Sequence, residues 1–94
     1  MVLLKVTVTI PGALRQFTHS NSEVDLEALT VEDVISSLDS MFPGLKAFLL
    51  DEGKQVRRYV NIYVNKDEIR SKNGLMTPLK DGDRVQIIPA VAGG

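Results

Sequence analysis

The chain has 94 residues, of which 44% are hydrophobic and 24% charged, and its formal net charge is −1. This length fits one domain with a modest core, and the near-neutral charge gives no electrostatic case for nucleic acid or an anionic membrane as a partner. Disulfides, thiolate metal sites and cysteine nucleophiles are excluded because the sequence contains no cysteine. We expect a cytoplasmic protein, since no stretch reaches the ~18 apolar residues of a membrane span and the first residues do not resemble a signal peptide.

The charge is unevenly distributed along the chain. Residues 1–50 carry three basic and six acidic side chains, whereas residues 51–94 carry eight basic and six acidic ones. The C-terminal half is therefore mildly positive. Two interpretations stay open, a solvated surface of lysines and arginines or a surface that docks onto an acidic partner.

The N-terminal segment has the pattern of a β-strand. Apolar and polar residues alternate over residues 4–10, as expected of a strand with one buried face, and Pro11 and Gly12 end the pattern. Weaker alternation over residues 14–17 and 23–26, with a polar interruption between them, predicts a second strand antiparallel to the first.

A helix is predicted to begin at Thr30. The Thr30 hydroxyl can cap free backbone N–H groups, and the carboxylates of Glu32 and Asp33 complement the positive end of the helix dipole. Pro43 and Gly44 stop the helix. Its apolar residues at helical spacing are Val31, Val34, Ile35, Leu38, Met41 and Phe42.

The second half of the chain contains further strands. Residues 45–50 predict a short helical turn, and residues 51–54 predict a surface loop. Alternation over residues 57–65 predicts a strong strand. The composition of residues 80–83 is that of a turn, which leads into a last strand at residues 84–89.

This order of two strands, a helix and two or three strands is typical of an α+β protein with the β-grasp fold. The apolar stripe of the helix needs a surface to cover, and one face of a mixed sheet of four to five strands provides it. We expect the first and last strands to be parallel neighbours in the centre of the sheet. Residues 1–90 then form the domain, and residues 91–94 form a flexible C-terminal tail.

The most informative stretch is the C-terminal sequence Pro-Ala-Val-Ala-Gly-Gly at residues 89–94. At ~3.3 Å per residue its end can stand roughly 13 Å from the domain, far enough to enter a site on another protein. Gly93 and Gly94 have no Cβ, so they can follow Val91 and Ala92 through a channel too narrow for side chains. The reactive group would be the Gly94 carboxylate. A frayed terminus or a cloning remnant is the alternative.

The C-terminal half resembles that of a known family. Residues 81–94 combine an Asp-Gly-Asp turn, a hydrophobic strand, a proline and a small-residue tail ending in Gly-Gly. This is similar to the closing motif of the ubiquitin-like sulfur-carrier proteins of the MoaD and ThiS type. With Tyr-Val-Asn-Ile-Tyr-Val-Asn at residues 59–65, the ending resembles the carriers of cysteine biosynthesis most and the small subunit of molybdopterin synthase less. The loop at residues 51–54 departs from the shorter thiamine carriers.

The resemblance implies a defined chemistry at Gly94. A ubiquitin-activating-like enzyme, acting as adenylyltransferase and sulfurtransferase, would use ATP and magnesium to adenylate the carboxylate, and a sulfur donor would convert it to a thiocarboxylate. The downstream partner would be a cysteine synthase homologue or the large subunit of molybdopterin synthase. A ubiquitin-like protein modifier, with Gly94 joined to a lysine of a target, is an alternative because it shares the tail chemistry.

The remaining residues show no catalytic or metal-binding pattern. His19 is the single histidine and has neither metal-ligand spacing nor a triad around it, so we expect a surface residue. Asp81 and Asp83 lack the further oxygen ligands of a calcium loop, which favours a plain turn. There is no glycine-rich nucleotide-binding loop, so ATP should bind the partner. We expect a chain that is not an enzyme and binds no metal or cofactor. A binding module with an incidental tail is a third class.

Alternation also predicts which strand residues face outward. Val85 and Ile87 should face the core, which leaves Ile88 on the outer face of the sheet with Tyr59 and Tyr63. Exposed apolar side chains beside a tail are suited to a partner interface. The alternative is that another strand, or a neighbouring molecule in a crystal, covers them.

Overall fold

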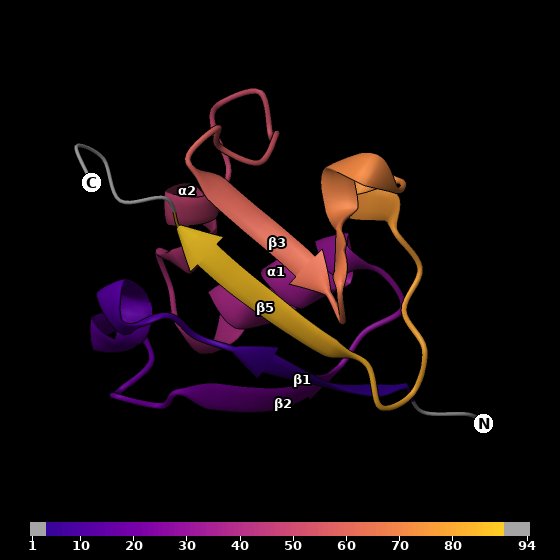
Figure 1. Ribbon diagram of the computed structural model, residues 1–94. Coiled ribbons are helices and arrows are strands. Elements are labelled where there is room, and N and C mark those ends of the chain that lie inside the picture. Colours follow the sequence, from indigo (N-terminus) through magenta and orange to yellow (C-terminus); the bar gives the residue numbers. More distant parts are fainter. Residues whose placement is uncertain (1–3, 90–94) are drawn as a thin grey trace.

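The computed structural model describes residues 4–89, which form a five-stranded mixed sheet with helices packed on one face (Figure 1). The helices are α1 (Val31–Met41) and the short α2 (Leu45–Leu49). The strands lie in the order β2-β1-β5-β3-β4 across the sheet. This order confirms the predicted β-grasp arrangement. The strands are β1 (Lys5–Thr9), β2 (Glu23–Glu27), β3 (Val60–Val64), β4 (Asp67–Glu68) and β5 (Arg84–Pro89).

The last strand, β5, lies in the centre of the sheet and has a neighbour on each side (Figure 1). It runs parallel to β1, with Val85 opposite Val8, as the sequence predicted. On its other side it runs antiparallel to β3, with Ile87 opposite Ile62. β2 and β4 form the two edges of the sheet.

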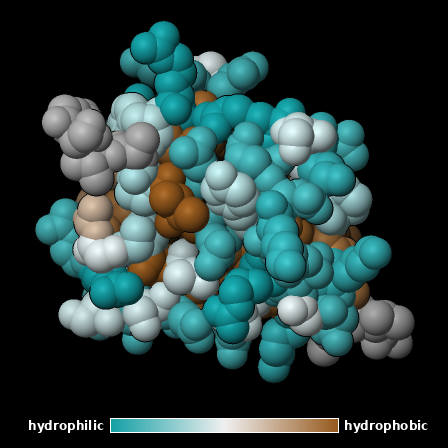
Figure 2. Space-filling model, in the orientation of Figure 1, coloured by the Kyte–Doolittle hydropathy of each residue, from teal (hydrophilic) through white to brown (hydrophobic). Residues whose placement is uncertain are grey.

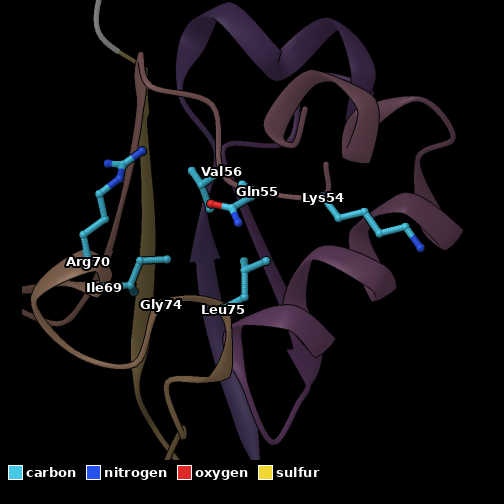
Figure 3. A pocket seen from close by; sticks show the side chains of 7 residues that line it. All are labelled: Lys54, Gln55, Val56, Ile69, Arg70, Gly74 and Leu75. Atoms are coloured by element: carbon cyan, nitrogen blue, oxygen red, sulfur yellow. The ribbon is translucent and has the colours of Figure 1, made fainter. Parts of the chain in front are cut away.

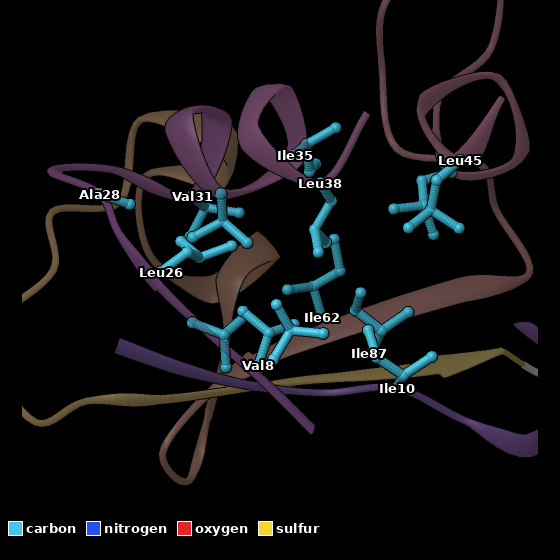
Figure 4. Packing of buried hydrophobic residues seen from close by; sticks show 14 of the residues in the cluster. Val8, Ile10, Leu26, Ala28, Val31, Ile35, Leu38, Leu45, Ile62 and Ile87 are labelled. Carbon is cyan, nitrogen blue, oxygen red and sulfur yellow. The ribbon is translucent and has the colours of Figure 1, made fainter. Parts of the chain in front are cut away.

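The predicted helix stripe and the inner face of the sheet form one core, except that Met41 at the end of the helix is exposed. Figure 4 shows Val31 and Leu38 of α1 pointing toward Val8, Ile62 and Ile87 of the sheet. All five side chains are buried, and each is worth ~1.5–3 kcal/mol relative to its exposed state. Along β1 and β3 buried residues alternate with less buried ones, so the period-two prediction is confirmed there.

Thr30 caps helix α1, as predicted. Its Oγ1 accepts a hydrogen bond from the backbone N–H of Asp33 at 3.3 Å, and Asp33 Oδ2 accepts one from the N–H of Leu29 at 3.0 Å. At the other end, Asp39 Oδ1 accepts from the N–H of Gly44 at 3.2 Å. Gly44 has a φ of 102°, a left-handed conformation that suits glycine and allows the sharp change of direction into α2.

The prediction of strand structure at residues 14–17 is wrong. A 3-10 helix, Gly12–Phe17, occupies this stretch, and the N–H of Leu14 donates to the carbonyl of Pro11 at 2.9 Å. The physical reason is that β1 already has β2 on one side and β5 on the other, so it offers no edge for another strand. Leu14 is completely buried as a single anchor, not as one of an alternating series.

β3 is shorter than the strand predicted at residues 57–65. The N–H of Arg57 donates to the carbonyl of Leu49 at 3.0 Å, and the N–H of Val60 donates to the carbonyl of Arg57 at 2.9 Å. The residues before Val60 therefore form a turn that follows α2. The turn predicted ahead of β5 is present, with Gly82 in the left-handed region at a φ of 88°.

Replacing Thr30 by alanine tests the capping assignment. The variant loses the oxygen that binds the Asp33 N–H, so we expect the free energy of unfolding to fall by about 1 kcal/mol in urea denaturation. Thr30→Ser keeps an oxygen at this position and should retain most of the stability. Equal losses in the two variants would show that the hydroxyl is not the source of the effect.

Candidate functional site

The predicted reactive residue, Gly94, lies outside the described residues. So do the predicted threading residues Val91, Ala92 and Gly93, and the predicted boundary between domain and tail. The structure does describe the strand that leads toward the tail, because β5 ends at Pro89. The candidate site is therefore built from β5 and the residues around its end.

β5 is paired on both sides at its start and on one side at its end. β1 pairs with residues 84–86 of β5, whereas β3 pairs with residues 85–89. Within the part of the chain that the structure describes, residues 87–89 thus have β3 as their only strand partner. The direction of the last residues of β5 therefore depends on this single pairing.

Two prolines end the pairing between β1 and β5. The N–H of Thr7 donates to the carbonyl of Asp83 at 3.1 Å, and in a parallel ladder every second residue of the strand repeats this pattern. From Thr7 the repeat reaches residue 9 and then residue 11 on the side of β1, and it reaches residue 89 on β5. The ladder would need backbone N–H groups at both of these last positions, which are Pro11 and Pro89. Proline has none, so the ladder stops and the end of β5 is left to β3.

Ile88 lies on the outer face of the sheet, as predicted. Its side chain is 46% exposed and that of Tyr59 is 47% exposed, Tyr63 is partly buried, and Val85 and Ile87 face the core. Figure 2 shows this outer face as mostly hydrophilic with a small brown area in its middle. No strand among residues 4–89 covers Ile88, so the alternative of a covering strand is wrong for this residue. The role of these three outer residues, which we name the docking patch (Ile88, Tyr59 and Tyr63), stays a prediction.

Arg70 binds the start of β3, a contact that sequence analysis missed. Its Nη2 donates to the carbonyls of Arg57 and Val60, both at 2.9 Å, and its Nη1 donates to Asn61 Oδ1 at 3.0 Å. Glu68 Oε2 lies 3.5 Å from Nη1. These hydrogen bonds join residues that are 9 to 13 positions apart, so local periodicity carries no signal for them.

A surface cavity of about 260 Å³ lies between Arg70 and the loop after α2 (Figure 3). Val56 and Leu75 supply apolar walls. Figure 3 shows Lys54 and Arg70 on opposite sides of Gln55, so their charged ends do not converge on one point. Ligand sites combine apolar walls with a few convergent polar groups, and this cavity lacks that convergence.

The other residues singled out from the sequence have structural roles. His19 is exposed, and its ring lies against that of Phe42 with centroids 5.8 Å apart. Asp81 Oδ1 accepts from the N–H of Lys5 at 3.0 Å, and Asp83 Oδ2 accepts from a backbone N–H of its own turn at 2.8 Å. The prediction of a plain turn is confirmed. Residues 4–89 contain no cluster of three metal-ligating side chains, and none of their helices has the length and hydrophobicity to span a membrane.

Residues 8–94 match the family model described as "ThiS family". The chain belongs to the ThiS family. The predicted relationship to ubiquitin-like proteins of the MoaD and ThiS type is thereby confirmed, and the match includes the tail that the structure does not describe.

Two of the relatives described below cover nearly the whole chain, and the third covers a smaller part of it. The sulfur carrier protein CysO of Mycobacterium tuberculosis is 42% identical over 93 residues, which covers 97% of this chain and 100% of that protein. A chain in the crystal structure of the Amycolatopsis orientalis BexX/CysO complex has a TM-score of 0.89 at 42% identity, with 95% of this chain and 99% of that chain covered. Small archaeal modifier protein 3 of Haloferax volcanii is 42% identical over 65 residues, or 69% of this chain and 70% of that protein.

The two isoleucines at the end of β5 allow a matched test of the outer face. Ile88→Asp places a carboxylate in solvent, so we expect the free energy of unfolding to change by about 1 kcal/mol or less, the range of strand propensities. Ile87→Asp buries an unpaired carboxylate and should abolish cooperative unfolding. Thermal unfolding followed by circular dichroism measures both. Similar losses in both variants would contradict the assignment of Ile88 to the outer face.

Proposed function

We propose that this chain is a sulfur carrier of cysteine biosynthesis. Its Gly94 carboxylate is adenylated, converted to a thiocarboxylate and used to deliver sulfide to a biosynthetic enzyme. The observation that carries the proposal is the family match, which runs through residue 94, and the similarity to CysO over that protein's whole length supports it. ATP, magnesium and a sulfur donor are cytoplasmic reagents, which fits a cytoplasmic location.

The order of the proposed steps follows from the chemistry of a carboxylate. A terminal carboxyl group has a pKa of ~3.3–3.7, so near neutral pH it is an anion that repels nucleophiles and needs activation. In the first step a carboxylate oxygen attacks the α-phosphorus of ATP, and pyrophosphate leaves. In the second, a sulfur nucleophile attacks the acyl carbon, the bond from that carbon to the AMP oxygen breaks, and a carbon–sulfur bond forms.

The proposed division of labour assigns delivery to this chain and catalysis to its partners. The activating enzyme binds ATP and magnesium and shields the reactive adenylate from water. The folded body fixes the start of the tail through β5 and presents the docking patch beside it. A cysteine synthase homologue is the proposed acceptor of sulfide.

Two alternatives share the tail chemistry. The similarity to small archaeal modifier protein 3 favours a protein modifier, in which Gly94 forms an amide with a target lysine. The small subunit of molybdopterin synthase is the alternative within sulfur transfer. The acceptor enzyme distinguishes a carrier of cysteine biosynthesis from a molybdopterin synthase subunit. A cysteine synthase homologue would consume the thiocarboxylate in the first case, and a molybdopterin synthase large subunit would consume it in the second.

Mass spectrometry tests the proposed chemistry. Incubation with the cognate activating enzyme, ATP, magnesium and a sulfide source should give a species about 16 Da heavier, because sulfur replaces one oxygen at Gly94. Deletion of Gly93 and Gly94 should abolish the shift while the fold survives. Larger conjugates on denaturing gels would instead identify a modifier, and no adduct with an enzyme that is active on another carrier would overturn the proposal.

Calorimetry with the same activating enzyme tests the docking patch. Ile88→Asp and Tyr63→Asp place a charge where the proposed interface excludes water, so each should weaken binding by about tenfold or more, since losses above ~1 kcal/mol are typical of central interface residues. Leu29→Asp is the control, because Leu29 is 63% exposed and follows the end of β2, at the opposite end of the sheet from Pro89. Unchanged affinity in both patch variants would remove the patch from the interface.

A further inference from the structure

We propose that Arg70 is a positioning residue for the tail. Its guanidinium holds the start of β3, and β3 in turn holds the end of β5 in the direction that the activating enzyme requires. The inference rests on the proposed function, because a direction matters only if the tail must enter a partner's site. It is carried by three observations, which concern the edge of β3, the geometry of the guanidinium and the pairing of β5.

The edge of β3 is only partly covered by a strand. β4 has two residues and pairs with Tyr63 and Val64 of β3. The chain then turns into a 3-10 helix, Ile69–Ser71, so no residue of β4 pairs with the first residue of β3, Val60. The carbonyl of Val60 accepts from Arg70 Nη2 instead, at 2.9 Å. One side chain thus takes the place of a neighbouring strand.

The guanidinium suits this position because of its planar fork of donors. Nη2 reaches the Val60 carbonyl and also the carbonyl of Arg57, which lies in the turn before the strand. Arg57 is itself tied to α2, because its Nη2 donates to the carbonyl of Ala47 at 3.0 Å. A lysine at position 70 would carry the same charge but not the rigid fork. Arg70 therefore links the start of β3 to the body of the domain.

The end of β5 depends on this part of β3. Ile88 pairs with Asn61 and Pro89 pairs with Val60, while β1 stops pairing at Gln86. Asn61 also accepts a bond from Arg70 through its side chain, at 3.0 Å. Loosening the start of β3 would consequently release the last two residues of β5 together. The first of these residues, Ile88, belongs to the docking patch. The second, Pro89, is the last residue of β5.

Hydrogen exchange tests the local part of this inference. In Arg70→Ala the amides of Asn61 and Ile88 should exchange about tenfold faster, equivalent to ~1.4 kcal/mol, whereas the Val8 amide of β1 should be unchanged. Arg70→Lys should behave like the alanine variant. Arg84→Ala is the matched control, because it removes a half-exposed arginine, paired with Glu23, from the opposite end of β5. Unchanged exchange at Asn61 and Ile88 in Arg70→Ala would overturn the inference.

Steady-state kinetics test the positioning role. With the activating enzyme, kcat/KM for thiocarboxylate formation should fall about tenfold in Arg70→Ala and Arg70→Lys, because only the fraction of molecules with an aligned tail reacts. Arg84→Ala should keep the wild-type value. Wild-type kinetics in Arg70→Ala, or full activity in Arg70→Lys, would overturn the positioning role and leave the proposed function standing. No adduct with the wild-type chain would overturn both.

Discussion

The rest of the structure depends on how β5 is held, with two neighbours at its start and one at its end. The inner side of β5 is anchored in the core, since Val85 and Ile87 are buried and each such side chain contributes ~1.5–3 kcal/mol. A strand paired along both sides to its last residue would draw the following residues into the sheet. A strand paired on neither side would fray. Pairing on one side fixes the end of β5 through β3 alone, within the part of the chain that the structure describes.

The outer face of the sheet satisfies most of its own polar groups. Arg84 pairs with Glu23 at 2.8 Å, and the Thr7 hydroxyl donates to Asp25 at 2.8 Å. Exposed pairs of this kind contribute ~0–1 kcal/mol, so their consequence is a self-contained polar surface more than a gain in stability. Ile88 and Tyr59 are exposed apolar side chains on this face. A small apolar area in polar surroundings is typical of transient interfaces, which fits the proposed carrier, since it would have to dissociate from the activating enzyme and from the acceptor.

Local sequence patterns correctly predicted the elements whose defining contacts or burial pattern involve residues only a few positions apart. The cap at Thr30, the alternation in β3 and the limits of β5 were all correct, because burial on one face repeats with the period of the element. The strand prediction at residues 14–17 was wrong because β1 has no free edge, and this depends on the strand order of the whole sheet. Arg70 was missed for the same reason, since its acceptors belong to β3 and to the turn before it. The tail residues were identified by sequence alone, and their roles stay predictions.

The position of Pro89 shows how the sequence specifies the end of the sheet. The N–H of Asn65 donates to the carbonyl of Arg84 at 2.7 Å, which makes every second pair from there a hydrogen-bonded one. By this alternation Ile88 is hydrogen-bonded to β3, whereas the nitrogen of Pro89 faces the side of β1. A proline at position 89 therefore ends the ladder with β1 without removing a bond to β3, and a proline one residue earlier would do the reverse. The choice of residue 89 thus leaves β3, and the guanidinium of Arg70 that binds its first residue, as the support for the end of β5.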